Sequence, residues 1–174
     1  MKKPLYTIGH GNRKAKDFLS LLKNFEIDYL IDVRSKPYSR FNPQYNQNEL
    51  KFFLEKNKIR YVFMGDALGG RPNDKSCYEN ERINYGAVKT KDFFIHGIER
   101  LKMAYGKDIN AAIMCSESNP CKCHRSKLIG TVLDSDQMIL KHIDENGQLK
   151  NHATVMNEIN KGFAETDIFG NVFY

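Results

Sequence analysis

Residues 29–34 decide the fold class, and they read Tyr29-Leu30-Ile31-Asp32-Val33-Arg34. The run is apolar apart from one aspartate and the closing arginine, which is typical of a strand buried on both faces of a parallel sheet. Apolar side chains at helical spacing precede it at residues 18–25 and follow it at residues 50–54. This alternation of strand and helix patterns predicts the βαβ units of an α/β protein.

The alternation continues along most of the chain. The patterns predict strands at residues 5–8, 29–33, 59–64, 109–115 and 138–143, and helices at residues 18–25, 50–54, 93–103 and 124–133. Residues 34–46 and 65–72 read as loops, residues 73–88 have no clear period, and the tail from residue 150 could form a short helix at 155–159 or fray. We therefore expect a three-layer α/β sandwich with a mainly parallel central sheet of about five strands, forming one domain over residues 1–174.

Composition narrows the class of protein. The 174 residues are 41% hydrophobic and 28% charged, as in globular domains. No apolar run approaches the roughly 20 residues of a membrane-spanning helix, and the start of the chain lacks a signal-peptide pattern. Three of the four cysteines fall within residues 115–123, which favours chemistry or metal binding over a disulfide framework. We expect a cytoplasmic protein with no membrane partner.

The positive charge is unevenly placed. The first 75 residues hold 15 Lys and Arg against 8 Asp and Glu, whereas the remainder holds 12 against 13. A basic field around a cleft favours anionic ligands, so the expected partner is a phosphate-containing small molecule or a nucleic acid. A solvated basic surface would give the same composition, and the sequence leaves the oligomeric state open.

Polar clusters follow four of the predicted strands, at residues 9–13, 32–42, 65–72 and 115–125. The carboxyl ends of parallel strands share one edge of the sheet, where ligands of open α/β folds bind. The loops expected at the opposite edge, such as residues 24–28, are chemically plain. The sequence therefore predicts one site built by these four clusters.

The first two clusters each allow a functional and a structural interpretation. Gly9-His10-Gly11-Asn12 could present backbone amides to a phosphate or form only a turn, and it lacks the spacing of a dinucleotide-binding motif. Asp32 could act as a general acid or base or pair with Arg34 in the core. Arg34 and Arg40 could grip a phosphate, with Asn42 close by.

The fourth cluster carries the most reactive side chains. Cys115 closes a strand, Glu117 follows it, and Cys121-Lys122-Cys123-His124-Arg125 begins a helix whose N-terminus could hold an anion. Zinc could bind Cys115, Cys121, Cys123 and His124, but the spacing between Cys121 and Cys123 is poor for zinc. The Cys-x5-Arg loop of thiol phosphatases is absent, and inert buried cysteines are a further reading. We therefore predict no metal and no cofactor.

Several of these motifs, taken in order, resemble a bacterial and archaeal family known as domain of unknown function 488. The resemblance spans roughly residues 5–145 and implies a three-layer α/β fold with the polar motifs in one pocket, without bringing an established reaction. Cys121 stands where the family motif has no cysteine. The motifs that carry the resemblance are Thr7-Ile8-Gly9-His10-Gly11, Asp32-Val33-Arg34, Pro37, Ser39-Arg40-Phe41-Asn42, Leu68-Gly69-Gly70-Arg71, and Cys115-x-Glu117 with Cys123-His124-Arg125.

The first hypothesis is a hydrolase or group transferase acting on a phosphorylated, nucleotide or nucleic-acid substrate. Its catalytic candidates are Asp32, Glu117, His10 and His124. Its substrate-binding candidates are Arg34, Arg40, Asn42, Arg71, Arg125, Cys115 and Cys123. A non-catalytic nucleic-acid-binding module and a thiol- or zinc-dependent enzyme are the alternatives.

Overall fold

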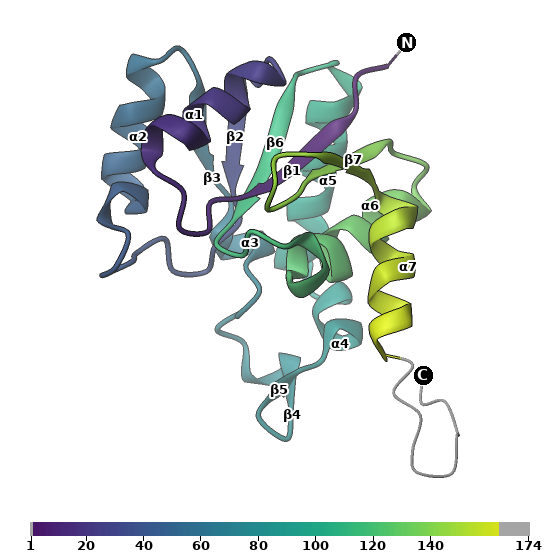
Figure 1. The fold of residues 1–174 in the computed structure, drawn as a ribbon. Helices are drawn as coiled ribbons and strands as arrows, with labels where there is room; N and C mark the ends of the chain where they lie inside the picture. The colour runs from purple at the N-terminus through teal and green to yellow at the C-terminus, as the bar shows by residue number, and fades with distance from the viewer. Residues whose placement is uncertain (1, 164–174) are drawn as a thin grey trace.

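The computed structural model describes residues 2–163 and has a six-stranded sheet between two layers of helices (Figure 1). The strand order is β3-β2-β6-β1-β7-β8, and only β8 runs antiparallel to its neighbour. The strands are β1 (Leu5–Gly9), β2 (Tyr29–Asp32), β3 (Arg60–Phe63), β6 (Ala111–Cys115), β7 (Leu140–Ile143) and β8 (Leu149–Asn151). The predicted α/β class and mainly parallel sheet are confirmed, with one strand more than expected.

One helical layer consists of α1 (Ala15–Asn24) and α2 (Gln47–Lys56), which connect β1 to β2 and β2 to β3. Their buried side chains Phe18, Leu22, Leu50 and Leu54 pack against Leu30 of β2 in one apolar cluster. The helical spacing of these apolar residues is what directs them to a common face.

The other helical layer is built mainly by α5 (Asp92–Gly106) and α6 (Thr131–Ser135). Phe94, Ile98 and Leu101 of α5 pack against Ile31 of β2 and Ile113 of β6 in a second apolar cluster. Leu30 and Ile31 are neighbours in the strand and serve opposite clusters, because successive side chains of a strand point to opposite faces. A sheet covered on both faces explains why β6 is buried throughout.

Three segments differ from the predicted elements. The expected loop at 65–72 contains the one-turn helix α3 (Gly65–Leu68), and residues 73–88 contain the hairpin β4 (Tyr78–Glu79) and β5 (Arg82–Ile83) followed by α4 (Tyr85–Lys89). The hairpin projects away from the central sheet (Figure 1). The tail helix α7 (His152–Phe163) is longer than expected, and residues 164–174 lie outside the described residues.

A π-helix at Arg125–Gly130 precedes α6, within the predicted helix 124–133. Short 3-10 turns occur at Pro43–Tyr45, Lys75–Cys77 and Pro120–Lys122. Over residues 2–163, no helix combines the length and apolar character that crossing a membrane requires.

Candidate functional site

A pocket of about 650 Å³ opens at the carboxyl edge of the sheet, between the loops that follow β2, β3 and β6. The chain leaves β2 toward the α1–α2 layer and leaves β6 toward the α5–α6 layer. Adjacent strands whose connections cover opposite faces leave a crevice at their carboxyl ends, where α/β proteins bind ligands. The strand order therefore accounts for the position of the pocket.

Positive charge dominates the pocket wall. The lining includes the cations Arg34, Lys36, Arg71 and Lys122 and a single carboxylate, Glu117. Within residues 2–163, Lys36, Arg71 and Lys122 are exposed and take part in no ion pair. Such a lining favours an anionic ligand.

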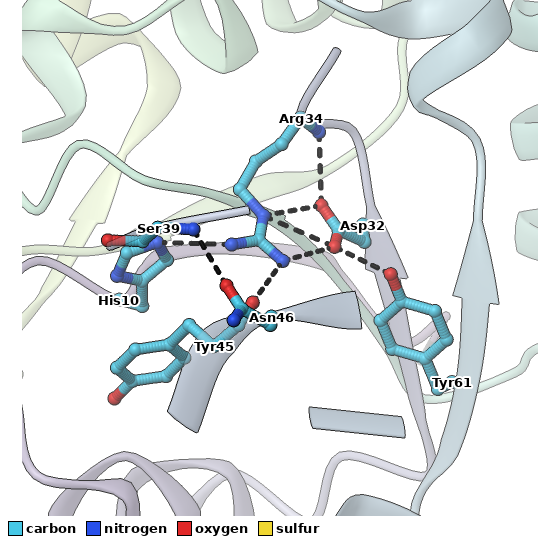
Figure 2. A network of polar contacts seen from close by, with 7 residues as sticks. All are labelled: His10, Asp32, Arg34, Ser39, Tyr45, Asn46 and Tyr61. Carbon is cyan, nitrogen blue, oxygen red and sulfur yellow. Dashed lines mark hydrogen bonds and ion pairs between the residues drawn. The ribbon is translucent and has the colours of Figure 1, made fainter. Parts of the chain in front are cut away.

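Asp32 and Arg34 form a buried ion pair at the end of β2 (Figure 2). The Asp32 carboxylate accepts hydrogen bonds from the Arg34 guanidinium at 2.6 and 2.9 Å, from the Arg34 amide at 3.0 Å and from the Tyr61 hydroxyl at 2.7 Å. Asp32 has no exposed surface and does not line the pocket. These contacts favour the structural interpretation of Asp32, although Arg34 also contributes to the pocket wall.

His10 belongs to the same network. Its ring stacks on Tyr45 with centroids 4.1 Å apart, Nδ1 lies 2.7 Å from the Gly11 carbonyl, and Nε2 lies 3.4 Å from an Arg34 nitrogen. A neutral ring that donates from Nδ1 can accept from Arg34 at Nε2. Burial lowers the pKa of His10 from 6.5 to about 4. His10 does not line the pocket. We call His10, Asp32, Arg34, Tyr45 and Tyr61 the ion-pair network.

The glycines beside His10 serve packing. The amides of His10 and Gly11 donate to the carbonyls of Cys115 and Ser116, at 3.0 and 2.8 Å. A Cβ atom on Gly9 would lie 1.7 Å from the Glu117 carbonyl oxygen, so only glycine fits there. The turn thus supports the loop after β6, and these two amides are not free to bind a phosphate.

Cys115, Cys123 and His124 meet in the pocket wall, and we call them the thiol–histidine cluster. Cys115 ends β6, whereas Cys123 and His124 precede the π-helix. His124 Nδ1 lies 3.7 Å from the Cys115 sulfur and 3.8 Å from the Cys123 sulfur. His124 Nε2 is buried and has no hydrogen-bond partner in the described part of the chain.

The pKa values of the two thiols are shifted in opposite directions. A hydrogen bond to Cys123, together with burial, raises the pKa of Cys115. Burial opposes ionisation of Cys123, yet hydrogen bonds with Cys115 and His124 and the Arg125 charge hold its pKa well below the ordinary value of cysteine. The pair therefore favours a thiolate on Cys123 beside a protonated Cys115.

Arg125 is fully buried and does not line the pocket. Its guanidinium donates to the carbonyls of Glu117 and Ser118 and, at 3.2 Å, to the Thr7 hydroxyl. These contacts hold the loop after β6 against β1. The geometry does not favour the predicted anion-binding role of Arg125, because the side chain is buried outside the pocket and each of its three nitrogens already donates to a partner.

The remaining candidates divide between the pocket and its surroundings. Arg71 and Glu117 line the pocket and are exposed, whereas Arg40 and Asn42 do not line it. Asn42 instead donates to the Asn12 side chain at 3.1 Å. Cys121 is also separate, with its sulfur 3.3 Å from Glu158.

Sequence reasoning missed part of the pocket wall. Tyr78 and Ile83 come from the hairpin and Tyr85 follows it; from the sequence, the two tyrosines were loop aromatics that could stack on a base or only pack, and Ile83 was not a candidate. Gly70 has a specific task, because a Cβ atom there would lie 2.7 Å from His124 Nδ1. The paired glycines at 69 and 70 were the available signal for this close approach.

The fold and the pocket define an α/β protein with a basic, thiol-containing site at the carboxyl edge of its sheet. The chain belongs to the family described as Domain of unknown function DUF488, whose model matches residues 14–132. The predicted family is confirmed over a span shorter than the 5–145 of the resemblance. No curated protein and no solved structure matches the chain.

Proposed function

We propose that this protein is an enzyme, a hydrolase or group transferase, that acts on a phosphate-bearing substrate in the pocket. One observation carries the proposal: three cations that form no ion pair within residues 2–163 line the same 650 Å³ cavity as a carboxylate, two thiols and an imidazole. Arg71, Lys36 and Lys122 would bind the anionic group, and Tyr78 and Tyr85 could pack against a nucleoside base.

Glu117 is the preferred general acid or base. It is the only carboxylate in the described lining, and it is exposed to a substrate there. A carboxylate repels a phosphate, so a site selected for binding alone gains nothing from it. Its presence among the cations favours catalysis, whereas Asp32 is committed to Arg34 and Tyr61.

The test separates binding from chemistry. The full chain is assayed against a panel of phosphomonoesters, nucleotides and short oligonucleotides by phosphorus NMR. We expect Glu117→Gln to lower kcat by about 100-fold or more with little change in substrate affinity. Arg71→Ala with Lys122→Ala should mainly raise KM, and Arg100→Ala, an exposed substitution on α5 outside the pocket, is the matched control. Binding of these ligands without turnover of any would overturn the proposal.

A second candidate is a nucleic-acid-binding module, favoured by the loop after β2. Tyr38 and Phe41 are 73% and 91% exposed there, beside the cations Lys36 and Arg40. Exposed aromatics between basic residues can stack on unpaired bases. Binding of single-stranded oligonucleotides that weakens steeply with salt and is lost in Phe41→Ala would support it, and salt-insensitive binding would contradict it.

A further inference from the structure

We propose that Cys115, Cys123 and His124 bind one zinc ion, with a fourth coordination position open to the pocket. The three ligand atoms lie within 4.8 Å of one another and come from two segments that meet at the pocket wall. Zinc binding itself follows from this cluster alone, and only the reaction assigned to the ion rests on the proposed function.

The two nitrogen–sulfur distances fit a tetrahedral ion. A zinc ion about 2.0–2.1 Å from nitrogen and about 2.3 Å from sulfur would hold nitrogen and sulfur about 3.6 Å apart. His124 Nδ1 lies 3.7 and 3.8 Å from the two sulfurs, close to that separation from both. A single ring nitrogen placed almost equally far from two thiols matches shared coordination better than one directed hydrogen bond.

The ligand chemistry selects the metal. Two thiols and an imidazole suit zinc, whereas magnesium and calcium prefer oxygen ligands. Three protein ligands with an open position are typical of catalytic zinc, and four of structural zinc. Cys121 is not a fourth ligand, because its sulfur contacts Glu158 in α7. The spacing of Cys121 and Cys123, which argued against zinc in the sequence, therefore does not bear on this site.

The surroundings hold the cluster in place. The Arg125 amide donates to the Cys123 sulfur at 3.4 Å, as amides do to metal-bound thiolates. The Arg125 guanidinium binds the carbonyls of Glu117 and Ser118, which fixes the loop that carries Cys115. Gly70 packs on the His124 ring. The ring turns Nδ1 toward both sulfurs, whereas Nε2 has no hydrogen-bond partner among the described residues.

An ion here would supply a nucleophile for the proposed reaction. Zinc-bound water ionises near neutral pH, and Glu117 can accept the proton. The oxygen of the ionised water would form the new bond to phosphorus with its own electron pair. The leaving group departs with the pair of the broken bond and takes the proton from Glu117. No oxidant or reductant is needed.

The experiment uses the full chain, freed of metal by a chelator and titrated with Zn²⁺ by calorimetry and with Co²⁺ by absorption. We expect one ion per chain and a sulfur-to-cobalt charge-transfer band with the intensity of tetrahedral coordination. Cys115→Ser, Cys123→Ser and His124→Ala should each weaken zinc by at least about 100-fold. Cys77→Ser and Cys121→Ser, which leave the cluster intact, are the matched controls.

Two results would overturn the site: a wild-type cobalt spectrum without thiolate bands, or equal zinc affinity in the cluster variants and the controls. The wild-type spectrum keeps the test valid even if a variant misfolds, which circular dichroism would reveal. Failure of the proposed function is distinguishable. Stoichiometric zinc binding without turnover of any phosphate substrate would support the metal site and contradict the proposed function. Unchanged turnover in metal-free protein would contradict the role of zinc in the reaction and support the enzyme.

Discussion

Two buried polar groups of side chains follow the neighbouring strands β2 and β6, yet they are satisfied to very different degrees. In the ion-pair network, the Asp32 carboxylate accepts from Arg34 and Tyr61, and Arg34 also donates to the Tyr45 carbonyl at 2.8 Å. In the thiol–histidine cluster, His124 has only two long contacts to sulfur, and its Nε2 has no partner within residues 2–163.

This difference in hydrogen bonding indicates that the ion-pair network has a structural role and that the thiol–histidine cluster has a functional one. Burying a polar group is costly unless hydrogen bonds replace its lost water, so a saturated network is what a stable framework requires. A buried nitrogen without a partner, as His124 Nε2 is among the described residues, has to be explained by something that the protein binds or does. The ion-pair network fixes the loop after β2, while the thiol–histidine cluster remains available to a ligand in the pocket.

Acid should have the largest effect on stability, because burial opposes protonation of two histidines in the folded chain, His10 in the ion-pair network and His142 outside it. Burial lowers the pKa of His10 to about 4 and that of His142 to about 3, against 6.5 in an unfolded chain. The unfolded state therefore takes up these protons first as pH falls. Above about pH 6.5, where both histidines are neutral in the folded and unfolded states, they do not reduce the free energy of unfolding. Below that, it should fall by up to about 1.4 kcal/mol per pH unit for each histidine.

Urea unfolding between pH 7 and pH 4 measures this slope. His10→Gln and His142→Gln should each make it shallower, because each removes one group that stays neutral in the native state. Gln at position 142 can still bond to Thr7, which the His142 ring contacts at 2.7 Å. A flat profile over this range would show that these rings are protonated in the folded protein.

Asp32→Ala should have the next largest effect, about 3–5 kcal/mol of lost stability at pH 7, because it leaves the Arg34 charge buried without its partner. Tyr61→Phe, which removes one hydrogen bond to the same carboxylate, should cost only about 1 kcal/mol. Urea denaturation of both variants checks the difference. An Asp32→Ala protein of normal stability but without activity would restore the catalytic role first expected for Asp32.

The sequence predicted the fold well where a regular pattern of apolar residues continued over several helical turns or along a whole buried strand. Helix α5 and strand β6 could be predicted because their apolar residues are numerous and regular. The hairpin at 78–83 could not, because strands of two residues have no measurable alternation. The strand β8 was missed since its three residues are exposed or half-buried and resemble the polar tail that surrounds them.

The sequence predicted the edge of the sheet where the pocket opens, but not which side chains line the pocket. Parallel topology was enough to gather the loops after β2, β3 and β6 at one edge. Whether an arginine faces the pocket depends on tertiary contacts, so Arg125 and Arg71 look alike in sequence, although one is buried among carbonyls and the other is exposed. Local spacing grouped Cys115, Cys123 and His124 with Cys121 as possible zinc ligands, but it could not reveal that the Cys121 sulfur lies against Glu158 instead.

The smallest effect is expected for His124→Ala in metal-free protein. Because Nε2 has no partner to lose among the described residues and the contacts to sulfur are long, removing the ring should change stability by no more than about 1 kcal/mol. Chemical denaturation in the presence of a chelator checks this value against the cost of Asp32→Ala. A cost as large as that of Asp32→Ala would place His124 in the structural framework and end the distinction between the two groups.

Stabilisation by zinc is a further test of the difference between the thiol–histidine cluster and the ion-pair network. A ligand that binds only the folded state adds about 2.7 kcal/mol of stability when its concentration is 100 times its Kd. The wild-type chain should therefore gain this much when zinc replaces the chelator, and His124→Ala should gain far less. Asp32→Ala should gain nearly as much as wild type if it folds, because Asp32 lies outside the thiol–histidine cluster. Equal gains in all three proteins would mean that zinc acts elsewhere on the chain, since the cluster would then make no difference to the stabilisation.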